Sequence, residues 1–341
     1  MAGPEQGGRL GEFSRIRRYL APLAAGCPGA LGLTDDAAVL TVPNGQELVV
    51  TTDAMVAGVH FLDSDPPADI AAKLLRTNLS DLAAMGAVPF GYSLVLALPL
   101  ERDDAWLAAF AAGLAEDQQR YVIPLTGGDS VATSGPVTLA ISALGLVPAG
   151  QALTRRVRGP AAEQLLFVTG TLGDAALGLK FVLGTLEAAA APAADRAALI
   201  GRLRRPEPRL TVGQALRGLA TAALDISDGL VADIGHIAEV SGCSAVIYAQ
   251  KLPLSAPARA LLGRNPALWP AILTGGDDYE LAFTAPNACK PALMQLENRL
   301  GVAITEIGRL ENGPAGQVTA YDDEGQPLRL ATAGWSHFPG D

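Results

Sequence analysis

Two short stretches of this sequence carry residue types suited to binding phosphate and metal. Thr-Gly-Gly-Asp occurs at 126–129, after the apolar run 121–125, and again at 274–277, after the apolar run 271–273. Paired glycines let a backbone approach a ligand closely, and the carboxylate that follows offers oxygen atoms to a hard cation. We interpret each stretch as a glycine turn that exposes an acid at the end of a strand.

Other aspartates also follow strand-like runs. Each one alone is typical of a turn or a helix cap. Carboxylates brought together repel one another unless a cation compensates them, and Mg²⁺ accepts carboxylate and phosphate oxygens together. The pattern as a whole therefore predicts a polyacidic site for metal and phosphate. Its members are Asp35, Asp36, Asp53, Asp129, Asp225, Asp228, Asp277 and Asp278, with Asp81 on a helix face beside Asn78.

Several familiar sites are excluded by their motifs. The sequence has no GxxxxGK[ST] phosphate loop, no GxSxG elbow, and no HRD or DFG signature of protein kinases. Gly170, Gly173 and Gly178 do not fit the spacing GxGxxG. With three histidines and no Cys–His spacing, a zinc site is not expected.

The elements that must position these residues alternate between helix and strand, which predicts a mixed α/β class. Apolar spacing predicts helices over 12–25, 68–87, 103–120, 172–184 and 227–243, the last with Ser227 as N-cap. Apolar and β-branched runs predict strands over 47–55, 92–100, 121–125, 137–148, 164–170, 244–249, 280–284 and 302–308. The segment 149–160, rich in Gly, Arg and Pro, predicts a boundary between domains at 1–150 and 151–341.

Composition limits the partners. The 25 basic and 35 acidic residues give a net charge of −10, which argues against a general binder of nucleic acid or anionic membranes. Cys27, Cys243 and Cys289 form no CxxC and cannot all pair, which favours a reducing compartment. No apolar run reaches membrane-spanning length, and the basic segment before Pro22 is too short and interrupted for a signal peptide. We therefore expect a cytoplasmic protein.

Nine stretches, in this order, resemble a known family. They are GEFSRIRRYL, LTDDAAVL, TTDAMVAGVHF, NLSDLAAMGA, LTGGDS, LTRR, RRPEPR, LDISDGLVADIGHIAE and TGGDDYEL. Together they resemble thiamine-monophosphate kinases, which belong to the superfamily of aminoimidazole ribonucleotide synthetase and selenophosphate synthetase. The resemblance runs from about residue 11 to about residue 338.

This resemblance implies a fold and a reaction. It implies two α/β domains, of which the N-terminal one carries much of the ATP and metal site and pairs with its twin in a homodimer. The C-terminal domain is expected to close over the ligands. The implied reaction is a direct in-line transfer from ATP to thiamine monophosphate, giving ADP and thiamine diphosphate without a covalent enzyme intermediate and with several Mg²⁺ ions.

The resemblance also implies roles for individual residues. The implied Mg²⁺ ligands are Asp35, Thr51, Thr52, Asp53, Asp81, Asp129, Asp225 and Asp228, with at least one of the two threonines acting through its backbone oxygen. The implied ATP contacts are Tyr121, Gly128, Asp129, Arg155 and Ser227. The implied substrate contacts are His60, Asp277 and Trp335.

Elementary chemistry is consistent with these roles. Phosphoryl transfer needs positioning and charge neutralisation more than covalent chemistry, and a guanidinium such as that of Arg155 can bind a phosphate in bidentate fashion. His60 is suited to bind substrate phosphate or to orient the ligand. Trp335 either stacks on a thiamine ring or anchors the C-terminal segment by packing. His236 and the RRPEPR turn are interpreted as structural.

Two residues depart from the family pattern. Thr34 stands where the family usually has a glycine before the first metal acid, and Asp277 is one methylene shorter than the usual glutamate. Two other readings stay open at this point: another ATP-dependent synthetase of the superfamily, and a nucleotide-binding dimer without activity. A selenophosphate synthetase would need a Cys or Lys near the N-terminus, and residues 1–11 contain neither.

Overall fold

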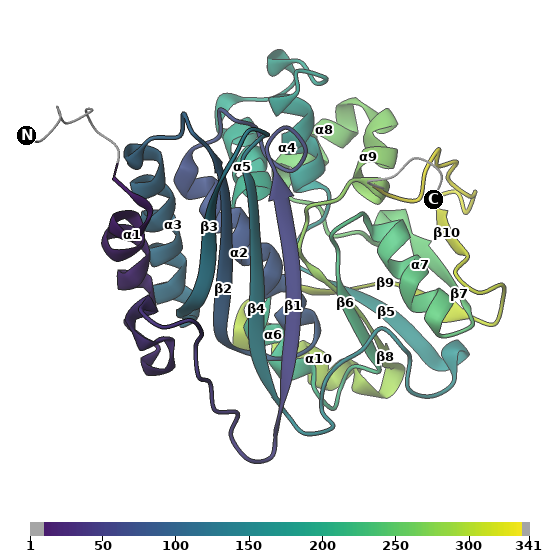
Figure 1. Cartoon of the computed structure of the whole chain (residues 1–341). Helices are drawn as coiled ribbons and strands as arrows, with labels where there is room; N and C mark the ends of the chain where they lie inside the picture. Colours follow the sequence, from purple (N-terminus) through teal and green to yellow (C-terminus); the bar gives the residue numbers. More distant parts are fainter. Residues whose placement is uncertain (1–9, 336–341) are drawn as a thin grey trace, which may run out of the picture. The chain divides into compact units, whose positions relative to one another are not determined.

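The computed structural model describes residues 10–335, and these divide into two compact units. The first unit runs to Leu82 and from Val88 to Ala149. The second comprises Ala83–Ala87 and the chain from Gly150 onward. Both mix helices with strands, so the predicted α/β class is confirmed (Figure 1).

The first unit is built on a four-stranded sheet with the order β1-β4-β2-β3. Its strands are β1 (Gln46–Val56), β2 (Val88–Pro99), β3 (Leu125–Thr133) and β4 (Thr138–Pro148). β4 pairs antiparallel with β1 and β2, whereas β2 and β3 are parallel. A parallel pair needs a crossover, and α3 (Asp104–Tyr121) provides it.

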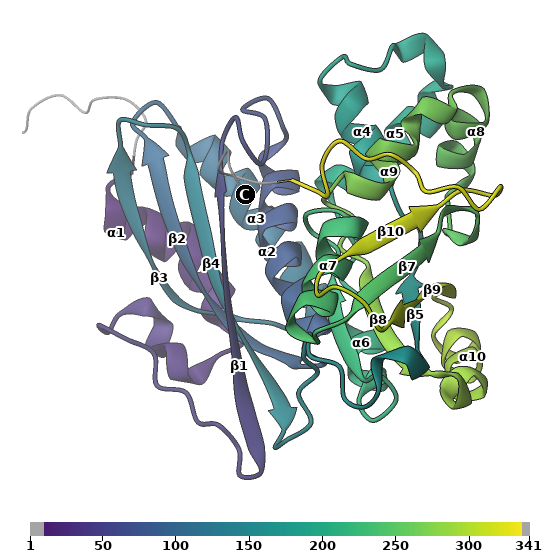
Figure 2. The same ribbon diagram turned by 90° about the vertical axis from the view of Figure 1, so that its right-hand side faces the viewer.

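Two long helices cover one face of this sheet (Figure 2). They are α2 (Pro67–Ala84) and α3, whose leucines at helical spacing, such as Leu75 and Leu79 on α2, are fully buried. The guanidinium of Arg76 donates from Nε and Nη2 to the two carboxylate oxygens of Asp117, each at 2.7 Å. This buried bidentate pair fixes α2 against α3, and α2 carries Asn78 and Asp81.

The N-terminal segment is less regular than predicted. Residues 12–25 were expected to form one amphipathic helix, but they form α1 (Glu12–Arg15), a π-helical turn (Ile16–Leu20) and a 3₁₀ turn (Ala21–Ala24). Pro22 has no N–H to continue an α-helix, which accounts for the tighter final turn. A second 3₁₀ segment, η3 (Pro28–Leu33), follows before β1 begins.

The second unit contains a six-stranded sheet with the order β10-β7-β9-β5-β8-β6. Its strands are β5 (Gln164–Thr169), β6 (Ala222–Asp225), β7 (Ser244–Tyr248), β8 (Leu281–Pro286), β9 (Ile304–Glu311) and β10 (Val318–Tyr321). Its helices are α4 (Asp174–Val182), α5 (Ala193–Arg204), α6 (Leu210–Leu216), α7 (Leu230–Val240), α8 (Ala256–Arg264), α9 (Trp269–Thr274) and α10 (Lys290–Leu300). A continuous apolar core includes Leu166, Leu224, Ile234 and Ile307.

Two predicted strands and one predicted helix cap in other parts of the chain are also wrong. The run 121–125 is not a strand: α3 extends to Tyr121 and β3 begins only at Leu125. The run 271–273 lies in helix α9, because three apolar residues cannot by themselves distinguish a strand from a helix. Helix α7 begins at Leu230 with Gly229 as N-cap, so Ser227 does not cap it.

No helix among residues 10–335 is both long enough and apolar enough to cross a membrane.

Candidate active site

A cavity of about 550 Å³ in the first unit contains part of the predicted site. Three of the predicted residues line it: Asp35, in the loop after η3, and Gly128 and Asp129, on β3. Its remaining wall is apolar where Ile16 and Leu20 project from the N-terminal segment. Among the described residues that line it, every formally charged side chain is a carboxylate. A cation is therefore the natural complement of this cavity.

The backbone of Gly128 on β3 lies directly against the backbone of β2. Gly128 is paired with Leu94, and a Cβ atom built on Gly128 would lie 1.9 Å from the Leu94 carbonyl oxygen. Asp129 is exposed and its Oδ1 accepts the Ser130 N–H at 2.8 Å. The close strand contact therefore requires glycine immediately before a carboxylate that faces the cavity. Both residues lie inside a strand rather than at its end, which corrects the turn interpretation.

A second group of predicted residues lies where β1 crosses α2. The Thr51 hydroxyl donates to Oδ2 of Asp81, and the Asp53 N–H donates to Oδ1 of Asn78 at 3.2 Å. Thr52 points to the opposite face of the sheet, where its hydroxyl is 2.8 Å from Ser142 Oγ. Thr51, Asp53 and Asp81 thus present hard oxygen atoms, which fit Mg²⁺. Thr52 can join them only through its backbone oxygen.

His60 and Tyr121 have different surroundings. Nδ1 of His60 accepts the Val56 N–H at 3.0 Å, so a neutral ring carries its proton on Nε2 and offers a donor there. The Tyr121 ring lies beside the guanidinium groups of Arg76 and Arg120, with centroid distances of 5.6 and 5.3 Å. Tyr121 is not among the described residues that line the cavity.

In the second unit, two acidic loops are joined by backbone hydrogen bonds. The N–H of Asp277 donates to Ser227 O at 2.9 Å, and the N–H of Tyr279 donates to Ile226 O at 2.8 Å. Asp277 and Tyr279 both have left-handed backbones, with φ of 68° and 50°. The hydroxyl of Tyr279 is 3.2 Å from Oδ1 of Asp277. The structure therefore brings the predicted residues Ser227 and Asp277 together.

Other predicted residues of this unit lie around the same loops. Asp225 is buried as the last residue of β6, and Trp335 is 59% exposed while its N–H donates to Asp228 O at 2.9 Å. Arg155 is exposed, and its charge acts on Asp233, which lies in the first turn of α7.

Asp233 is a residue of this site that the sequence analysis missed. Its Oδ2 accepts the N–H groups of Ser227, Asp228 and Gly229 at 3.0–3.1 Å, and so fixes the loop that leads into α7. Burial, reinforced by the Asp228 charge, raises the pKa of Asp233 to about 7 against the opposing hydrogen bonds. An acid in the first turn of a helix that follows an acidic loop was the available signal.

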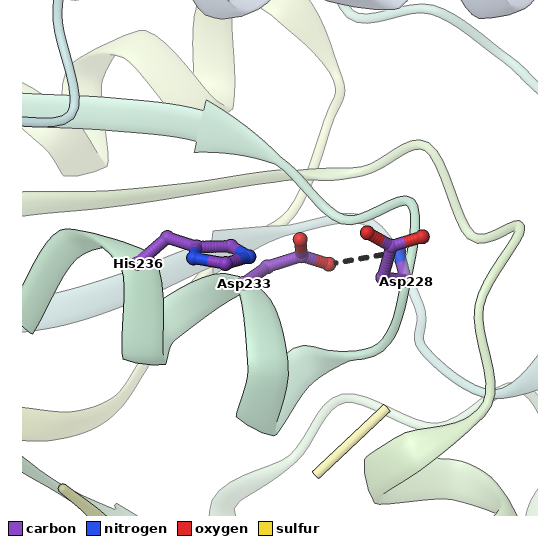
Figure 3. A group of neighbouring side chains, drawn as sticks. All are labelled: Asp228, Asp233 and His236. Carbon is purple, nitrogen blue, oxygen red and sulfur yellow. Dashed lines mark hydrogen bonds between the residues drawn. The ribbon is translucent and has the colours of Figure 1, made fainter. Parts of the chain in front are cut away.

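Asp228, Asp233 and His236 also form a small cluster. One potential ligand atom from each lies within 4.8 Å of the others (Figure 3). His236 had been interpreted as purely structural, and the imidazole in fact lies on the side of α7 that carries Asp233. The residues Asp225 and Asp277 are not part of this cluster among the described residues.

Matches to known domain families define the class of protein to which this chain belongs. Residues 34–147 match the AIR synthase related protein, N-terminal domain, and residues 161–320 match the corresponding C-terminal domain. Two such domains in one chain are the architecture described above.

Individual relatives then give the particular family. The chain is 43% identical over 329 residues to a thiamine-monophosphate kinase of Caulobacter vibrioides, covering 96% of this chain and 90% of that protein. A crystal structure of thiamine-monophosphate kinase from Stenotrophomonas maltophilia K279a superposes with a TM-score of 0.77 at 43% identity, covering 87% of this chain and 91% of that one. AaThiL complexed with AMPPCP and TMP gives 0.74 at 29% identity, covering 99% of both chains. The chain therefore belongs to the thiamine-monophosphate kinase family of AIR synthase related proteins.

Proposed function

We propose that this chain phosphorylates thiamine monophosphate with ATP to give thiamine diphosphate and ADP. The observation that carries the proposal is the near full-length identity of 43% with thiamine-monophosphate kinases. The complex of AaThiL with AMPPCP, an ATP analogue, and TMP supports both substrates. The cavity with Gly128 and Asp129 adds a physical reason, since it combines close backbone approach with carboxylates and suits a metal–nucleotide complex.

The reaction we infer is a direct in-line displacement. A phosphate oxygen of thiamine monophosphate attacks the γ-phosphorus of ATP, the bond from that phosphorus to the β–γ bridging oxygen breaks, and ADP leaves with the electron pair. No side chain of this chain forms a covalent intermediate. The residues act by position and charge, which is the main requirement of phosphoryl transfer.

Mg²⁺ is the proposed cofactor, and the donor set fits it because its members are carboxylate, hydroxyl and carbonyl oxygens. When bound, Mg²⁺ neutralises the charge of the phosphates and orients them. We assign the ligands in the first unit to Asp35, Thr51, Thr52, Asp53, Asp81 and Asp129. Those in the second unit are assigned to Asp225 and Asp228. The hydrogen bonds from the Thr51 hydroxyl to Asp81 and from the Asp53 N–H to Asn78 hold β1 against α2 at this group of ligands.

The remaining roles follow from the side chains. We assign nucleotide contacts to Gly128, Asp129, Arg155 and Ser227, and also to Tyr121, whose ring lies outside the cavity lining. Substrate contacts are assigned to His60, Asp277 and Trp335. The Nε2 donor of His60 suits a phosphate oxygen, and the exposed indole of Trp335 suits an aromatic ring.

We propose that a second copy of this chain covers the open face of the four-stranded sheet. Apolar side chains on that face are 41–59% exposed, and they are Leu48, Val50, Val88, Val95 and Val131. A contiguous exposed apolar face of this kind is typical of an interface. Light scattering should give twice the monomer mass, and Val50→Glu should give the monomer mass; a monomeric unmodified protein would contradict the pairing.

A cytoplasmic location is proposed on the cysteines. Cys27, Cys243 and Cys289 are all free thiols, as is usual for proteins of a reducing compartment.

The activity is tested by incubating the protein with thiamine monophosphate, ATP and Mg²⁺ and measuring thiamine diphosphate. Asp129→Asn should lower kcat by about a thousandfold, since it removes a charge that compensates metal and phosphate. Glu101→Gln, an exposed acid of the same unit, is the matched control and should keep normal turnover.

Two results would count against the proposal. If thiamine diphosphate does not form while another acceptor is phosphorylated, the substrate assignment is wrong. If Asp129→Asn turns over normally and keeps its circular dichroism spectrum, the metal role of Asp129 is wrong.

A further inference from the structure

A buried ion-pair network lies directly after the acidic loop 274–278. The Glu280 carboxylate is fully buried. Arg209 donates to it twice, from Nε to Oε2 and from Nη2 to Oε1, each at 2.6 Å. Arg202 Nη2 donates to Oε1 at 2.9 Å, and the Thr169 hydroxyl donates to Oε2 at 2.7 Å. None of these four residues belongs to the metal, ATP or substrate sets assigned above.

The chain around this network is fitted to it. A Cβ atom on Gly170 would lie 2.1 Å from Oε1 of Glu280, so residue 170 must be glycine for the carboxylate to sit there. The Thr169 hydroxyl also accepts the Leu281 N–H at 2.8 Å. The network therefore fixes the start of β8 against the end of β5.

The same network reaches back to the loop. The Glu280 carbonyl accepts the Ile226 N–H at 2.8 Å, and Arg202 Nη2 is 3.5 Å from the Asp278 carbonyl oxygen. Next to these anchors, Asp277 and Tyr279 adopt left-handed backbones that residues with side chains rarely adopt. Such conformations persist only where the surroundings impose them.

We propose that Arg202, Arg209 and Glu280 form a positioning clamp that imposes this loop conformation and so orients the Asp277 carboxylate toward the phosphorylated substrate. The orientation rests on the substrate role proposed above for Asp277. Arg202 comes from α5, and Arg209 from the turn before α6, a stretch interpreted from sequence as a simple proline turn. The clamp acts through the loop and does not touch the reacting atoms.

A bidentate arginine is the part of the clamp that can be varied most finely. Arg209→Lys keeps the charge but loses the paired geometry, whereas Arg209→Met loses both. Arg259→Lys is the matched control, since Arg259 is exposed on α8 in the same unit.

The first measurement compares KM for thiamine monophosphate with KM for MgATP. Arg209→Lys should raise KM for thiamine monophosphate by about tenfold, and Arg209→Met by more, with KM for MgATP within about twofold of the unmodified protein. The Arg259→Lys control should change neither. Equal rises in both KM values, or no rise in either, would overturn the proposal.

The second readout does not need turnover. Hydrogen exchange at the amides of Asp277 and Tyr279 should accelerate at least about tenfold in both Arg209 variants, while helix α10 keeps its protection. Unchanged exchange at these amides would overturn the clamp even if activity fell. If the unmodified protein makes no thiamine diphosphate, the proposed function fails and the orientation of Asp277 toward substrate falls with it, while the exchange data still decide whether the clamp holds the loop.

Discussion

The segments 126–129 and 274–277 carry the same four residue types, yet their backbones have little in common. The first lies within strand β3, paired with β2, and its aspartate is presented by an extended backbone. The second follows helix α9, and its aspartate has a left-handed backbone held by its own N–H bond to Ser227 O and by the bond from Tyr279 N–H to Ile226 O.

What the two segments share is a close approach of backbones. A Cβ atom on Gly128 would lie 1.9 Å from Leu94 O, and one on Gly276 would lie 2.1 Å from Ser227 O. In both places the glycine before the acid lets another backbone segment pass directly against it. The repeated sequence thus reflects a shared local requirement, glycine before a carboxylate, and not a repeated element of structure.

Among the variants that test this comparison, the largest effect is expected where the shared glycine requirement is broken. Gly128→Ala and Gly276→Ala should each lower kcat/KM by about a hundredfold, because displacing a site residue by about 1 Å has that order of effect. Each should also destabilise its unit by about 1–3 kcal/mol, the usual cost of overpacking. Steady-state kinetics and urea unfolding measure both quantities.

Gly127→Ala is the control for this pair. A Cβ atom on Gly127 would meet no heavy atom within 4 Å, so the stability of this variant should stay within about 0.5 kcal/mol of the unmodified protein. If Gly128→Ala were as well tolerated as Gly127→Ala, close packing would not explain the first segment.

The sequence was informative about the fold because long patterns are hard to mistake. The helices over 68–87 and 103–120 and the strand over 137–148 were predicted with nearly their observed bounds, since periodic apolar spacing persists through each. The short runs 121–125 and 271–273 failed for the opposite reason. In the first run, α3 continues through Tyr121. In the second run, the apolar residues Ile272 and Leu273 are buried side chains of a helix, α9.

For the site, motif acids were identifiable but their supports were not. Asp129, Asp228, Asp233 and Glu280 all lie in stretches that resemble the family, but nothing in those stretches marks Glu280 as a support of the loop. Glu280 meets Arg209 across 71 positions of sequence, and no local pattern indicates such a pair. The idea that each acid follows a strand also failed, because Asp53 and Asp129 lie inside strands.

A smaller effect should show that Asp129 and Asp277 act on different substrates. Asp277→Asn should raise KM for thiamine monophosphate by about tenfold while KM for MgATP changes less than about twofold, because the amide keeps the loop but loses the charge. Asparagine tolerates a left-handed backbone well, so thermal unfolding should be nearly unchanged. An equal loss for both substrates would mean that the second segment does not act on one substrate alone.

The smallest effect is expected on the pH dependence of stability, and it concerns the residue that follows each segment. This residue is Ser130 after the first segment and the buried Asp278 after the second. Both carboxylate oxygens of Asp278 accept the Gly173 N–H, at 3.0 and 2.9 Å. Burial nevertheless raises the pKa of Asp278 well above its ordinary 3.8. The folded state therefore holds a proton that the unfolded state has already released.

This difference predicts how stability depends on pH. The contribution of protonated Asp278 is fully present below about pH 3.8 and is lost as the pH rises toward the folded pKa, at up to about 1.4 kcal/mol per pH unit. Asp278→Asn should remove this part of the slope in urea unfolding at pH values above about 3.8, and the exposed Asp323→Asn should leave it. Because the first segment is followed by a serine, which does not titrate in this range, Ser130→Ala should also leave the slope unchanged. A slope as steep in Asp278→Asn as in the unmodified protein would mean that Asp278 does not contribute to it, and would remove this distinction between the two segments.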